Sequence, residues 1–360
     1  MKVLMGYLAT ELRGGQKFQL DFSKHFDTIQ VGFLSSNVTI KYENLVKKIG
    51  PIHLIPPTRK FFARLKTLRR LADEYEIIYL NKTTLNPFEF VLVKMAGFKY
   101  VVIHSHSIGK DCKNPYVKAG YYFLHYMSRP LVGKIADKMY ACSEEAGEWL
   151  FGKQFKKFGK VIPNGIDAQL FRYDEEKRNK IREKMKIEGS CIFHAGAFSA
   201  VKNQGYLIGA FAHFHKLHPD SILMFAGQGE LMEQAKERTR SLGIENSVMF
   251  LGQRNDVADL MQAADLFVLP SLLEGLPFVA MEAQAAGLPC IITARASEKV
   301  KITNLCQFFD ISKREEELSA AMEKQLELGR RDTMSEIRDA GFDLKRCAEE
   351  LETELINLVK

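Results

Sequence analysis

Short runs of branched apolar residues alternate along this chain with longer stretches of helical periodicity, and this alternation restricts the fold more than any other feature. The first half contains six such runs, at Val3–Ala9, Thr28–Leu34, Ile52–Ile55, Ile77–Leu80, Tyr100–His104 and Lys138–Cys142. The second half contains five, at Cys191–Ala195, Ile222–Ala226, Val248–Leu251, Leu266–Leu269 and Pro289–Ile292. Buried parallel strands have this composition, and helices connect them across the faces of a sheet. The sequence therefore predicts an α/β protein with two parallel sheets.

A change of composition near residue 165 divides the two series. The segment 161–167 contains Pro163 and the turn Asn164-Gly165, which is typical of a connection between domains. A chain of 360 residues is also too long for one core of ordinary size. We predict two Rossmann-like, doubly wound domains that face each other across a cleft, over residues 1–165 and 166–341. The charged helical segment 342–360 is expected to return to the first domain and complete it.

The composition excludes several classes of protein. Hydrophobic residues make up 46% of the chain, as in globular proteins, and no stretch is uniformly apolar enough to span a bilayer. The first nine residues form too short an apolar run for a secretory signal and are better interpreted as a strand. The six cysteines include no Cys-x-x-Cys pair and no spacing typical of zinc ligands, so we expect no metal and a reducing compartment.

The two halves of the chain differ in charge. Residues 1–164 contain 26 Lys and Arg against 13 Asp and Glu, a net charge of +13, whereas the remainder carries −6. A basic domain favours an anionic partner such as lipid or nucleic acid. Nucleic acid is the weaker interpretation, because no helix-turn-helix, zinc or aromatic-platform motif accompanies the charge.

Two basic stretches in the first domain have apolar residues at helical spacing. Residues 59–70 place Phe61, Leu65 and Leu68 on one stripe with six cations around it, and residues 153–160 interleave Phe155 and Phe158 with four lysines. Such stretches can rest on an anionic bilayer. A surface helix whose stripe packs on its own sheet has the same pattern, and either stretch alone leaves both interpretations open. The charge difference between the two domains favours contact with an anionic membrane surface.

Two carboxylates that lie eight positions apart, Glu274 and Glu282, mark the strongest candidate site. The run 266–269 reads as a strand, and we expect 271–276 to form the turn into a helix with Pro277 at its first position. The free N–H groups of such a helix start favour an anion such as a diphosphate, bound by Gly275, Leu276, Pro277 and Phe278. Glu274 would then lie beside the group that the diphosphate carries, and Glu282 would accept hydrogen bonds from ribose hydroxyls. An ordinary helix with two acids is the alternative.

Further candidates follow other predicted strands. Gly14 and Gly15 come after the first strand, where glycine lets backbone N–H groups approach a phosphate, although a plain flexible turn is equally typical. His104 and His106 end a strand at the edge where open α/β sheets hold ligands, and capping of backbone groups is the alternative role. Lys202 follows the first strand of the second domain, where it can neutralise a leaving diphosphate. The pair Gly227-x-Gly229 is more typical of a tight turn than of a dinucleotide site.

Several segments, in this order, give the chain a resemblance to a known family: Ile162-Pro163-Asn164-Gly165-Ile166-Asp167, Lys202-Asn203, Phe225-Ala226-Gly227-Gln228-Gly229, Phe250-Leu251-Gly252 and the Glu274/Glu282 pair. The chain resembles the family 4 retaining glycosyltransferases, which have the GT-B fold, and in particular those of bacterial capsule and exopolysaccharide synthesis. The resemblance implies a nucleoside-diphosphate sugar donor, commonly a UDP-sugar, and a lipid-linked oligosaccharide acceptor. It implies no cofactor and no metal, and a cytoplasmic protein peripheral to the inner face of the plasma membrane.

The resemblance also assigns roles to residues. It implies that His106, favoured over His104, hydrogen-bonds the donor sugar, that Gly14 and Gly15 face the donor diphosphate, and that Lys202 and Glu274 act in catalysis. Most members carry an arginine directly after the glycine that ends the first strand of the second domain, but here that position is Ala197. We therefore expect either another cation or an impaired enzyme. On this view Ala197→Arg should speed transfer by ~10²–10³ if one transition-state contact is restored.

Two rival functions remain open at this point. A sugar-nucleotide 2-epimerase has a similar two-domain fold and would exchange isotope at C2 of the sugar without an acceptor. A pseudoenzyme that binds the donor without turnover is the non-enzymatic alternative, and Ala197 favours it. The oligomeric state, the sugar, the base and the linkage are not predicted.

Overall fold

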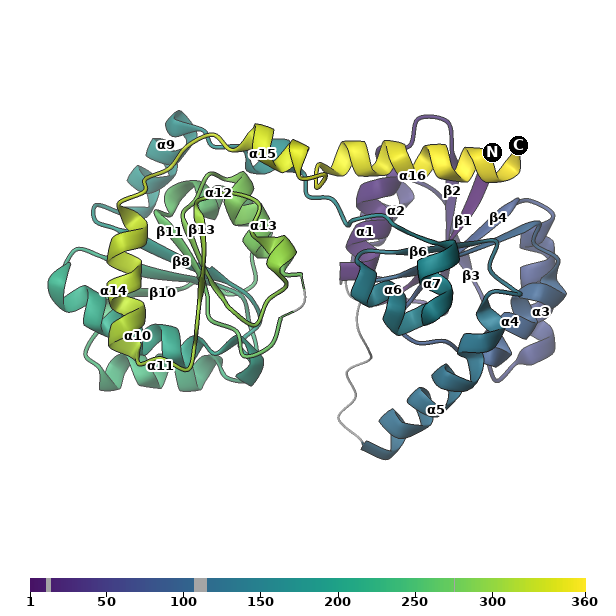
Figure 1. Cartoon of the computed structure of the whole chain (residues 1–360), viewed down its shortest axis with the longest axis horizontal. Helices are drawn as coiled ribbons and strands as arrows, with labels where there is room; N and C mark the ends of the chain where they lie inside the picture. Colours follow the sequence, from purple (N-terminus) through teal and green to yellow (C-terminus); the bar gives the residue numbers. More distant parts are fainter. Residues whose placement is uncertain (11–13, 107–114, 275) are drawn as a thin grey trace. The chain divides into compact units, whose positions relative to one another are not determined.

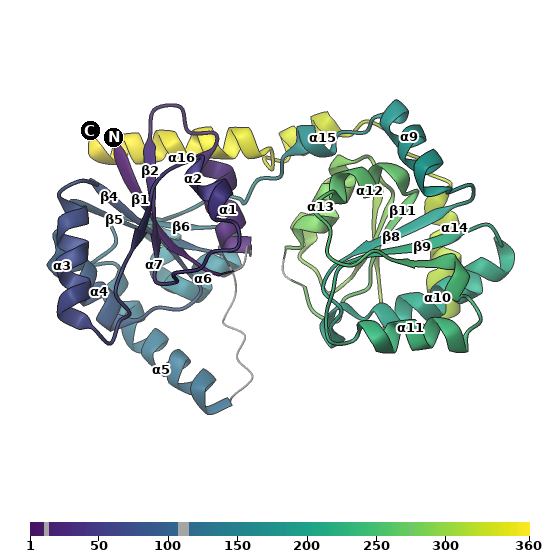
Figure 2. The same cartoon turned by 180° about the vertical axis from the view of Figure 1, so that it is seen from behind.

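The computed structural model describes residues 1–10, 14–106, 115–274 and 276–360. The chain forms two compact units, which we describe separately: unit 1 comprises Met1–Gly165 and Leu344–Lys360, and unit 2 comprises Ile166–Asp343. Each unit is a parallel sheet covered by helices on both faces (Figures 1 and 2). The division at Gly165 falls where the sequence places the first domain boundary.

In the described part of unit 1 the sheet has seven strands in the order β3-β2-β1-β4-β5-β6-β7. Their bounds are β1 Lys2–Leu8, β2 Gln30–Ser35, β3 Ile52–Leu54, β4 Ile77–Lys82, β5 Tyr100–Ser105, β6 Lys138–Ala141 and β7 Gly159–Val161. The first six are those predicted, all pairing in parallel. The prediction of six strands was one short, because Gly-Lys-Val at β7 is a brief edge strand without a continuous apolar run.

The helices of unit 1 form two layers around this sheet. One layer holds α3 Phe61–Ala72, α4 Pro87–Ala96, α6 Glu144–Phe151 and α7 Lys153–Phe158, and the other holds α1 Gly14–Ser23, α2 Glu43–Lys47 and α16 Leu344–Val359, with α5 Pro115–Val132 extending from the unit. The C-terminal helix α16 buries Leu344, Leu351 and Leu355 in the second layer. Its Glu352 carboxylate accepts hydrogen bonds from the backbone N–H groups of Asp27, Thr28 and Ile29. The last helix is therefore part of the core of unit 1.

Helix α3 settles the ambiguity over the first basic stretch. Leu65, Leu68 and Leu71 lie in the core, and Arg64, only 4% exposed, donates a hydrogen bond to the Pro56 carbonyl. The interpretation of this apolar stripe as membrane-facing is therefore wrong, because the sheet already covers it. In the second basic stretch Phe155 is buried in the same way, whereas Phe158 is exposed.

In the described part of unit 2 the sheet has six parallel strands in the order β10-β9-β8-β11-β12-β13. Their bounds are β8 Cys191–Ala195, β9 Ile222–Ala226, β10 Val248–Phe250, β11 Leu266–Leu269, β12 Cys290–Thr293 and β13 Cys306–Phe309. The sequence predicted five and missed β13, where Cys-Gln-Phe-Phe is short and only partly buried. Helix α13, which contains Glu282, follows β11, and Glu274 lies between them, so the predicted strand, turn and helix are present in that order.

The helices of unit 2 also form two layers. One face of the sheet carries α8 Ala168–Phe171, α9 Glu175–Met185, α12 Val257–Ala263, α13 Phe278–Ala285 and α15 Met334–Asp339, and the other carries α10 Gln204–Leu217, α11 Met232–Ser241 and α14 Glu315–Leu326. Short 3₁₀ turns occupy Ala200–Lys202, Glu245–Ser247 and Glu298–Val300. Within the described residues of the whole chain, no helix is long and apolar enough to cross a membrane.

Candidate functional site

The loops that follow β8 and β11 are joined at the carboxyl edge of the sheet of unit 2. The Leu272 N–H donates to the Val201 carbonyl at 2.7 Å, and the Asn203 side-chain amide donates to the Pro270 carbonyl at 3.2 Å. Asn203 has a left-handed backbone with φ of 56°, a conformation that asparagine tolerates better than most residues. The Lys202-Asn203 dipeptide therefore fixes one loop against the other.

This junction brings Lys202 and Glu274 into contact. The Lys202 Nζ lies 2.5 Å from the Glu274 Oε1, and the side chains are 23% and 11% exposed. Two residues that the sequence proposed for catalysis, 72 positions apart, are thus direct partners. An anionic ligand at this edge would compete with Glu274 for the Lys202 ammonium, so the pair is suited to exchange its charge partner on binding.

The start of α13 adjoins this ion pair in the sequence. Pro277 is the N-cap and Phe278 the first helical residue, one position later than predicted, while Leu276 is half-buried and Gly275 lies outside the described residues. Among the described residues, no side chain caps this helix start and its first turn holds no acid. The first N–H groups of a helix lack partners within it and carry the positive end of the dipole, so this end favours an anion.

Glu282 lies in the second turn of α13 and is only 8% exposed. A buried carboxylate needs hydrogen bonds to offset its desolvation, which distinguishes Glu282 from a solvated surface acid. Its role as acceptor for ribose hydroxyls stays a prediction.

The turn around Gly227 and Gly229 packs backbone against backbone beside Ala197. Gly227 has φ of +149°, and a Cβ there would lie 2.0 Å from the Gly196 carbonyl oxygen, while a Cβ at Gly229 would lie 2.2 Å from the Phe198 oxygen. Both glycines are therefore required by the close approach of two loops. The methyl side chain of Ala197 carries no charge, and the Ala197 carbonyl accepts a hydrogen bond from the Gln204 side chain at 2.9 Å.

Sequence analysis missed His194, which lies beneath these loops. It is fully buried on β8, its Nδ1 lies 2.9 Å from the Val268 carbonyl oxygen, and burial lowers its pKa to about 4. The ring is therefore neutral at pH 7, with Nδ1–H as the donor to β11. The only signal in the sequence was a histidine within an apolar run, which is more typical of a core residue than of a ligand.

Arg295 was also missed, although it follows β12 at the same edge. Its side chain is exposed, and Nη1 donates to the Leu272 carbonyl at 3.1 Å. The backbone N–H of Arg295 bonds the Thr293 hydroxyl at 3.2 Å, which fixes the turn after the strand. The available signal was similar to the one that pointed to Lys202, a cation in the loop that follows a strand of a parallel sheet.

In unit 1 the two predicted histidines also lie at the carboxyl edge of the sheet. The rings of His104 and His106 stack with centroids 4.1 Å apart, and Phe18 packs against both. His104 is fully buried and bonds the Tyr79 hydroxyl. The His106 ring nitrogens lie 2.5 Å from the Asn81 and 3.0 Å from the Asn164 side-chain oxygens.

Burial lowers the pKa of His106 to about 4, so its ring is neutral at pH 7 and donates from only one nitrogen. One of its two asparagine partners must therefore present its amide NH₂. His106 is less buried than His104, and both of its nitrogens are engaged within unit 1. Its contact with a donor sugar stays a prediction.

The glycine pair lies at the start of α1. Gly14 is the first residue of the helix, and a Cβ built at Gly15 would meet no atom within 4 Å. Packing among the described residues therefore does not require glycine at position 15. The segment 11–13, which leads into the pair, lies outside the described residues.

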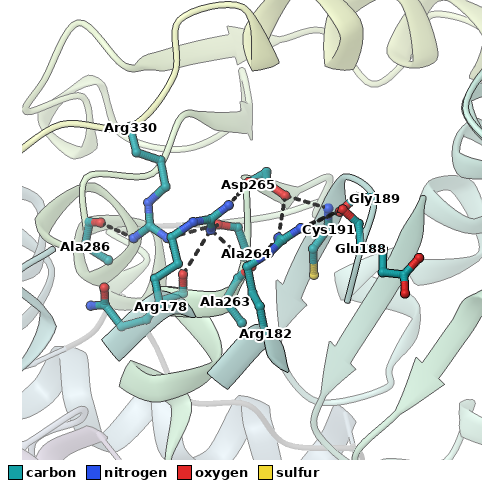
Figure 3. A network of polar contacts seen from close by, with 11 residues as sticks. Arg178, Arg182, Glu188, Gly189, Cys191, Ala263, Ala264, Asp265, Ala286 and Arg330 are labelled. Carbon is teal, nitrogen blue, oxygen red and sulfur yellow. Dashed lines mark hydrogen bonds and ion pairs between the residues drawn. The ribbon is translucent and has the colours of Figure 1, made fainter. Parts of the chain in front are cut away.

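A concavity of about 550 Å³ lies at the opposite, amino edge of the sheet of unit 2. Figure 3 shows Arg178 and Arg182 pointing toward Asp265 there, while Arg330, which lines the same concavity, bonds the Ala286 carbonyl. The Asp265 carboxylate pairs with Arg178 at 2.5 Å and Arg182 at 2.9 Å and accepts a hydrogen bond from the Cys191 N–H. This network attaches α9 to the starts of β8 and β11.

The guanidinium groups of this network are largely used by backbone carbonyls. Arg178 donates to the carbonyls of residues 262–264 at the end of α12, and Arg330 donates to those of Gln262, Ala264 and Ala286. Burial, with repulsion from Arg178, lowers the pKa of Arg330 to about 9, which leaves it charged at pH 7. Cations at helix C-termini stabilise the exposed carbonyls, so this cluster has a structural role.

Comparison with known proteins shows that most of unit 2 is similar to glycosyltransferases. Residues 175–341 match the family profile described as Glycosyl transferases group 1. EpsF of Bacillus subtilis (strain 168), which is named as a glycosyltransferase, is 35% identical over 224 residues, 59% of this chain and 56% of EpsF. The UDP-Gal:alpha-D-GlcNAc-diphosphoundecaprenol alpha-1,3-galactosyltransferase of Escherichia coli is 28% identical over 251 residues, 67% of this chain and 63% of that protein. The matched region thus spans less than two thirds of either relative.

Solved structures extend the likeness to both units. Anabaena Alr3699/HepE in complex with UDP superposes with a TM-score of 0.78 at 21% identity, over 99% of this chain and 100% of that chain. WaaG, a glycosyltransferase involved in lipopolysaccharide biosynthesis, superposes with a TM-score of 0.66 at 18% identity, over 98% of each chain. The fold is therefore GT-B, which confirms the predicted fold class.

Proposed function

We propose that the chain, whose residues 175–341 match the profile of the group 1 glycosyl transferases, transfers a sugar from a nucleoside-diphosphate donor to a hydroxyl group of a lipid-linked oligosaccharide during capsule or exopolysaccharide synthesis. The observation that carries the proposal is the Lys202–Glu274 ion pair, held at the carboxyl edge of the sheet beside the start of α13. Open parallel sheets bind ligands at this edge.

The chemistry assigned to these residues is charge stabilisation. As the bond between the sugar and the diphosphate breaks, negative charge gathers on the diphosphate, and Lys202 with the N–H groups of Leu276 and Phe278 stabilises it. Glu274, released by Lys202, orients the sugar hydroxyls and faces the positive charge of the sugar ring. The transfer proceeds with retention and without a metal, and a phosphate oxygen of the donor takes the proton of the acceptor hydroxyl.

A uridine nucleotide is the donor base that the proposal favours. The Escherichia coli relative is named for UDP-Gal, and the solved structure of Alr3699/HepE contains UDP. Glu282, buried in α13, supplies an acceptor for the ribose hydroxyls. Adenine and guanine nucleotides are therefore the natural comparison in a binding experiment.

For the acceptor side, the proposal places an anionic membrane against α4 and α5. These helices expose Phe88, Val91, Phe123, Met127 and Leu131, with Phe123 at 66% and Met127 at 60%. Unit 1 contains 29 Lys and Arg against 17 Asp and Glu, so its charge complements anionic lipid. Exposed aromatic and apolar residues on a basic unit are typical of interfacial helices. This surface replaces the stripe of α3 as the membrane contact, at the inner face of the plasma membrane.

The test begins with donor binding. Purified protein is heated with UDP-glucose, UDP-galactose, UDP-N-acetylglucosamine and the corresponding GDP- and ADP-sugars, and a bound ligand raises the melting temperature. The best ligand then serves as donor to an undecaprenyl-diphosphate sugar, and product is measured by mass spectrometry. A shift of several degrees with one sugar nucleotide and a product heavier by one sugar are expected. Absence of any shift across the panel would refute the proposed donor site.

The pseudoenzyme alternative is favoured by one feature, Ala197 at the position where the family resemblance implies an arginine. It predicts the same thermal shift but no product, and it also predicts no hydrolysis of the donor over hours. Single-turnover assays with excess protein separate the two functions, because an impaired enzyme still converts the bound donor once.

A further inference from the structure

The loop after β8 holds little positive charge for a site that binds a diphosphate. Within the fully described loop 196–203, Lys202 is the only cation, and its ammonium is paired with Glu274. Ala197 occupies the position where an arginine is expected from the family resemblance. A diphosphate carries two to three negative charges, so a second cation near the start of α13 would complete the site.

The strand order identifies where such a cation can come from. Because β11 lies between β8 and β12, the loop that follows β11 is flanked by the loops that follow its two neighbours. Lys202 contacts this middle loop through Glu274, and Arg295 contacts it from β12 through the Leu272 carbonyl. The Leu272 N–H in turn bonds the Val201 carbonyl. Both cations are thus fixed to one loop, two residues apart along it.

Arg295 retains most of its hydrogen-bonding capacity. Among the described residues Arg295 makes one side-chain hydrogen bond, from Nη1 to the Leu272 carbonyl, which uses one of five guanidinium N–H groups, and the side chain is exposed. Asp310, an acid near it, is engaged elsewhere: its pKa is lowered first by hydrogen bonds from Ser312 and only in smaller part by Arg295. A guanidinium with unused donors is the group that binds phosphate in bidentate fashion.

We propose that Arg295 binds the diphosphate of the sugar nucleotide and replaces, from the neighbouring strand, the arginine that is absent at Ala197. Arg295 is then a catalytic residue: it contacts the leaving diphosphate and stabilises the negative charge that develops when the glycosidic bond breaks. This inference rests on the proposed function and adds a residue to its donor site. It also accounts for how an enzyme of this family works with alanine after Gly196.

A positioning role is the alternative, in which Arg295 only holds Leu272 and thereby Glu274. The two roles differ in their dependence on phosphate. If Arg295 contacts the diphosphate, Arg295→Met weakens the binding of UDP about tenfold and leaves the binding of uridine, which has no phosphate, unchanged. If it only positions the loop, the substitution changes the binding of both ligands in similar proportion or of neither. Isothermal calorimetry measures both dissociation constants.

The decisive experiment is a double-mutant cycle with Ala197→Arg. Arg295→Met is expected to lower kcat/KM by ~10²–10³, the usual effect of removing one donor to a transition-state oxyanion. Ala197→Arg added to Arg295→Met is expected to restore at least tenfold of that loss, whereas Ala197→Arg alone changes kcat/KM by less than threefold because the second cation is already present. Lys299→Met, an exposed cation of the same segment, is the matched control and should keep full activity.

Three results would overturn the inference: kcat/KM within threefold of wild type for Arg295→Met, equal weakening of UDP and uridine, or a large gain from Ala197→Arg alone. Before the kinetics are compared, each variant must have the wild-type melting temperature. We expect this for Arg295→Met because the Arg295 side chain is exposed. Failure of the inference is distinct from failure of the proposed function, because wild-type protein that neither binds nor uses any sugar nucleotide refutes the function itself. Active wild type with an indifferent Arg295 refutes only the role of this residue.

Discussion

The two edges of the sheet in unit 2 both collect cations, but they use them differently. At the amino edge Arg178 and Arg182 pair with Asp265, and together with Arg330 they donate to carbonyls at the ends of α12 and α13 (Figure 3). At the carboxyl edge, among the described residues, Lys202 pairs with Glu274 and Arg295 donates a single hydrogen bond to a loop carbonyl. The amino edge has more arginines and they are more fully bonded, with the Nε of Arg330 as a donor without a partner among the described residues, whereas Arg295 at the carboxyl edge donates through Nη1 alone.

The difference shows that a concentration of positive charge does not by itself identify an anion site. Guanidinium groups that already bond carbonyls and a carboxylate would have to give up those bonds to hold a ligand, at roughly 1 kcal/mol each. The amino edge has a concavity of about 550 Å³, yet the arginines there connect α9 to the sheet. Substitutions at the two edges can therefore test whether stability depends on the amino edge and activity on the carboxyl edge.

The largest effect is expected from Lys202→Met at the carboxyl edge. Loss of the ammonium that stabilises the leaving diphosphate should lower kcat by ~10²–10³, or about 3–4 kcal/mol of transition-state stabilisation. The free energy of unfolding should fall by about 1–2 kcal/mol, because the Glu274 carboxylate, only 11% exposed, loses its charge partner. Steady-state kinetics and urea unfolding of the same preparation measure both. Unchanged kcat would break the assignment of activity to this edge.

Asp265→Asn should have the next largest effect, on stability. The substitution leaves Arg178 and Arg182 without their carboxylate in a half-buried network and is expected to lower the free energy of unfolding by about 3 kcal/mol. The kcat of the folded fraction should stay within twofold of wild type. Asp259→Asn is the matched control, since Asp259 pairs with Lys177 at 2.5 Å in a more exposed position, and should cost less than about 1 kcal/mol. Equal effects of the two substitutions would contradict the structural role of the network.

The sequence was most informative where a residue could be identified from its position after a predicted strand. Lys202 and Glu274 could be proposed because each follows a recognisable strand, and their contact follows from β8 and β11 being neighbours. Arg295 also follows a predicted strand, but its place beside the loop after β11 depends on β12 being the other neighbour of β11, and no local pattern contains that strand order. The orientation of α3 is a similar case: its apolar stripe is equally visible in either role, and only the position of the sheet decides between them.

Acidification should act through the carboxyl edge, where His194 is buried and neutral. Its pKa is lowered to about 4 in the folded protein, against an unfolded value near 6.5, so the unfolded state binds the proton first. Stability is therefore unaffected above pH 6.5 and falls between pH 6.5 and 4, by about 1.4 kcal/mol per pH unit for this residue. His106 in unit 1 adds a similar loss. Urea unfolding at pH 7, 6 and 5 measures the slope, and His194→Gln should reduce it; an unchanged slope would show that His194 does not titrate on unfolding.

Arg178→Lys should give the smallest effect and separates geometry from charge at the amino edge. Lysine keeps the positive charge beside Asp265 but lacks the planar fork that reaches three carbonyls and the carboxylate together, so we expect a loss of about 1–2 kcal/mol in the free energy of unfolding with kcat unchanged. The corresponding substitution at the carboxyl edge, Arg295→Lys, should leave stability unchanged and lower kcat/KM by roughly tenfold, since a point charge replaces a bidentate donor. If the change from arginine to lysine lowers stability at the amino edge and kcat/KM at the carboxyl edge, the arginines of unit 2 divide into structural and ligand-binding groups. If it lowers the same quantity at both edges, they do not.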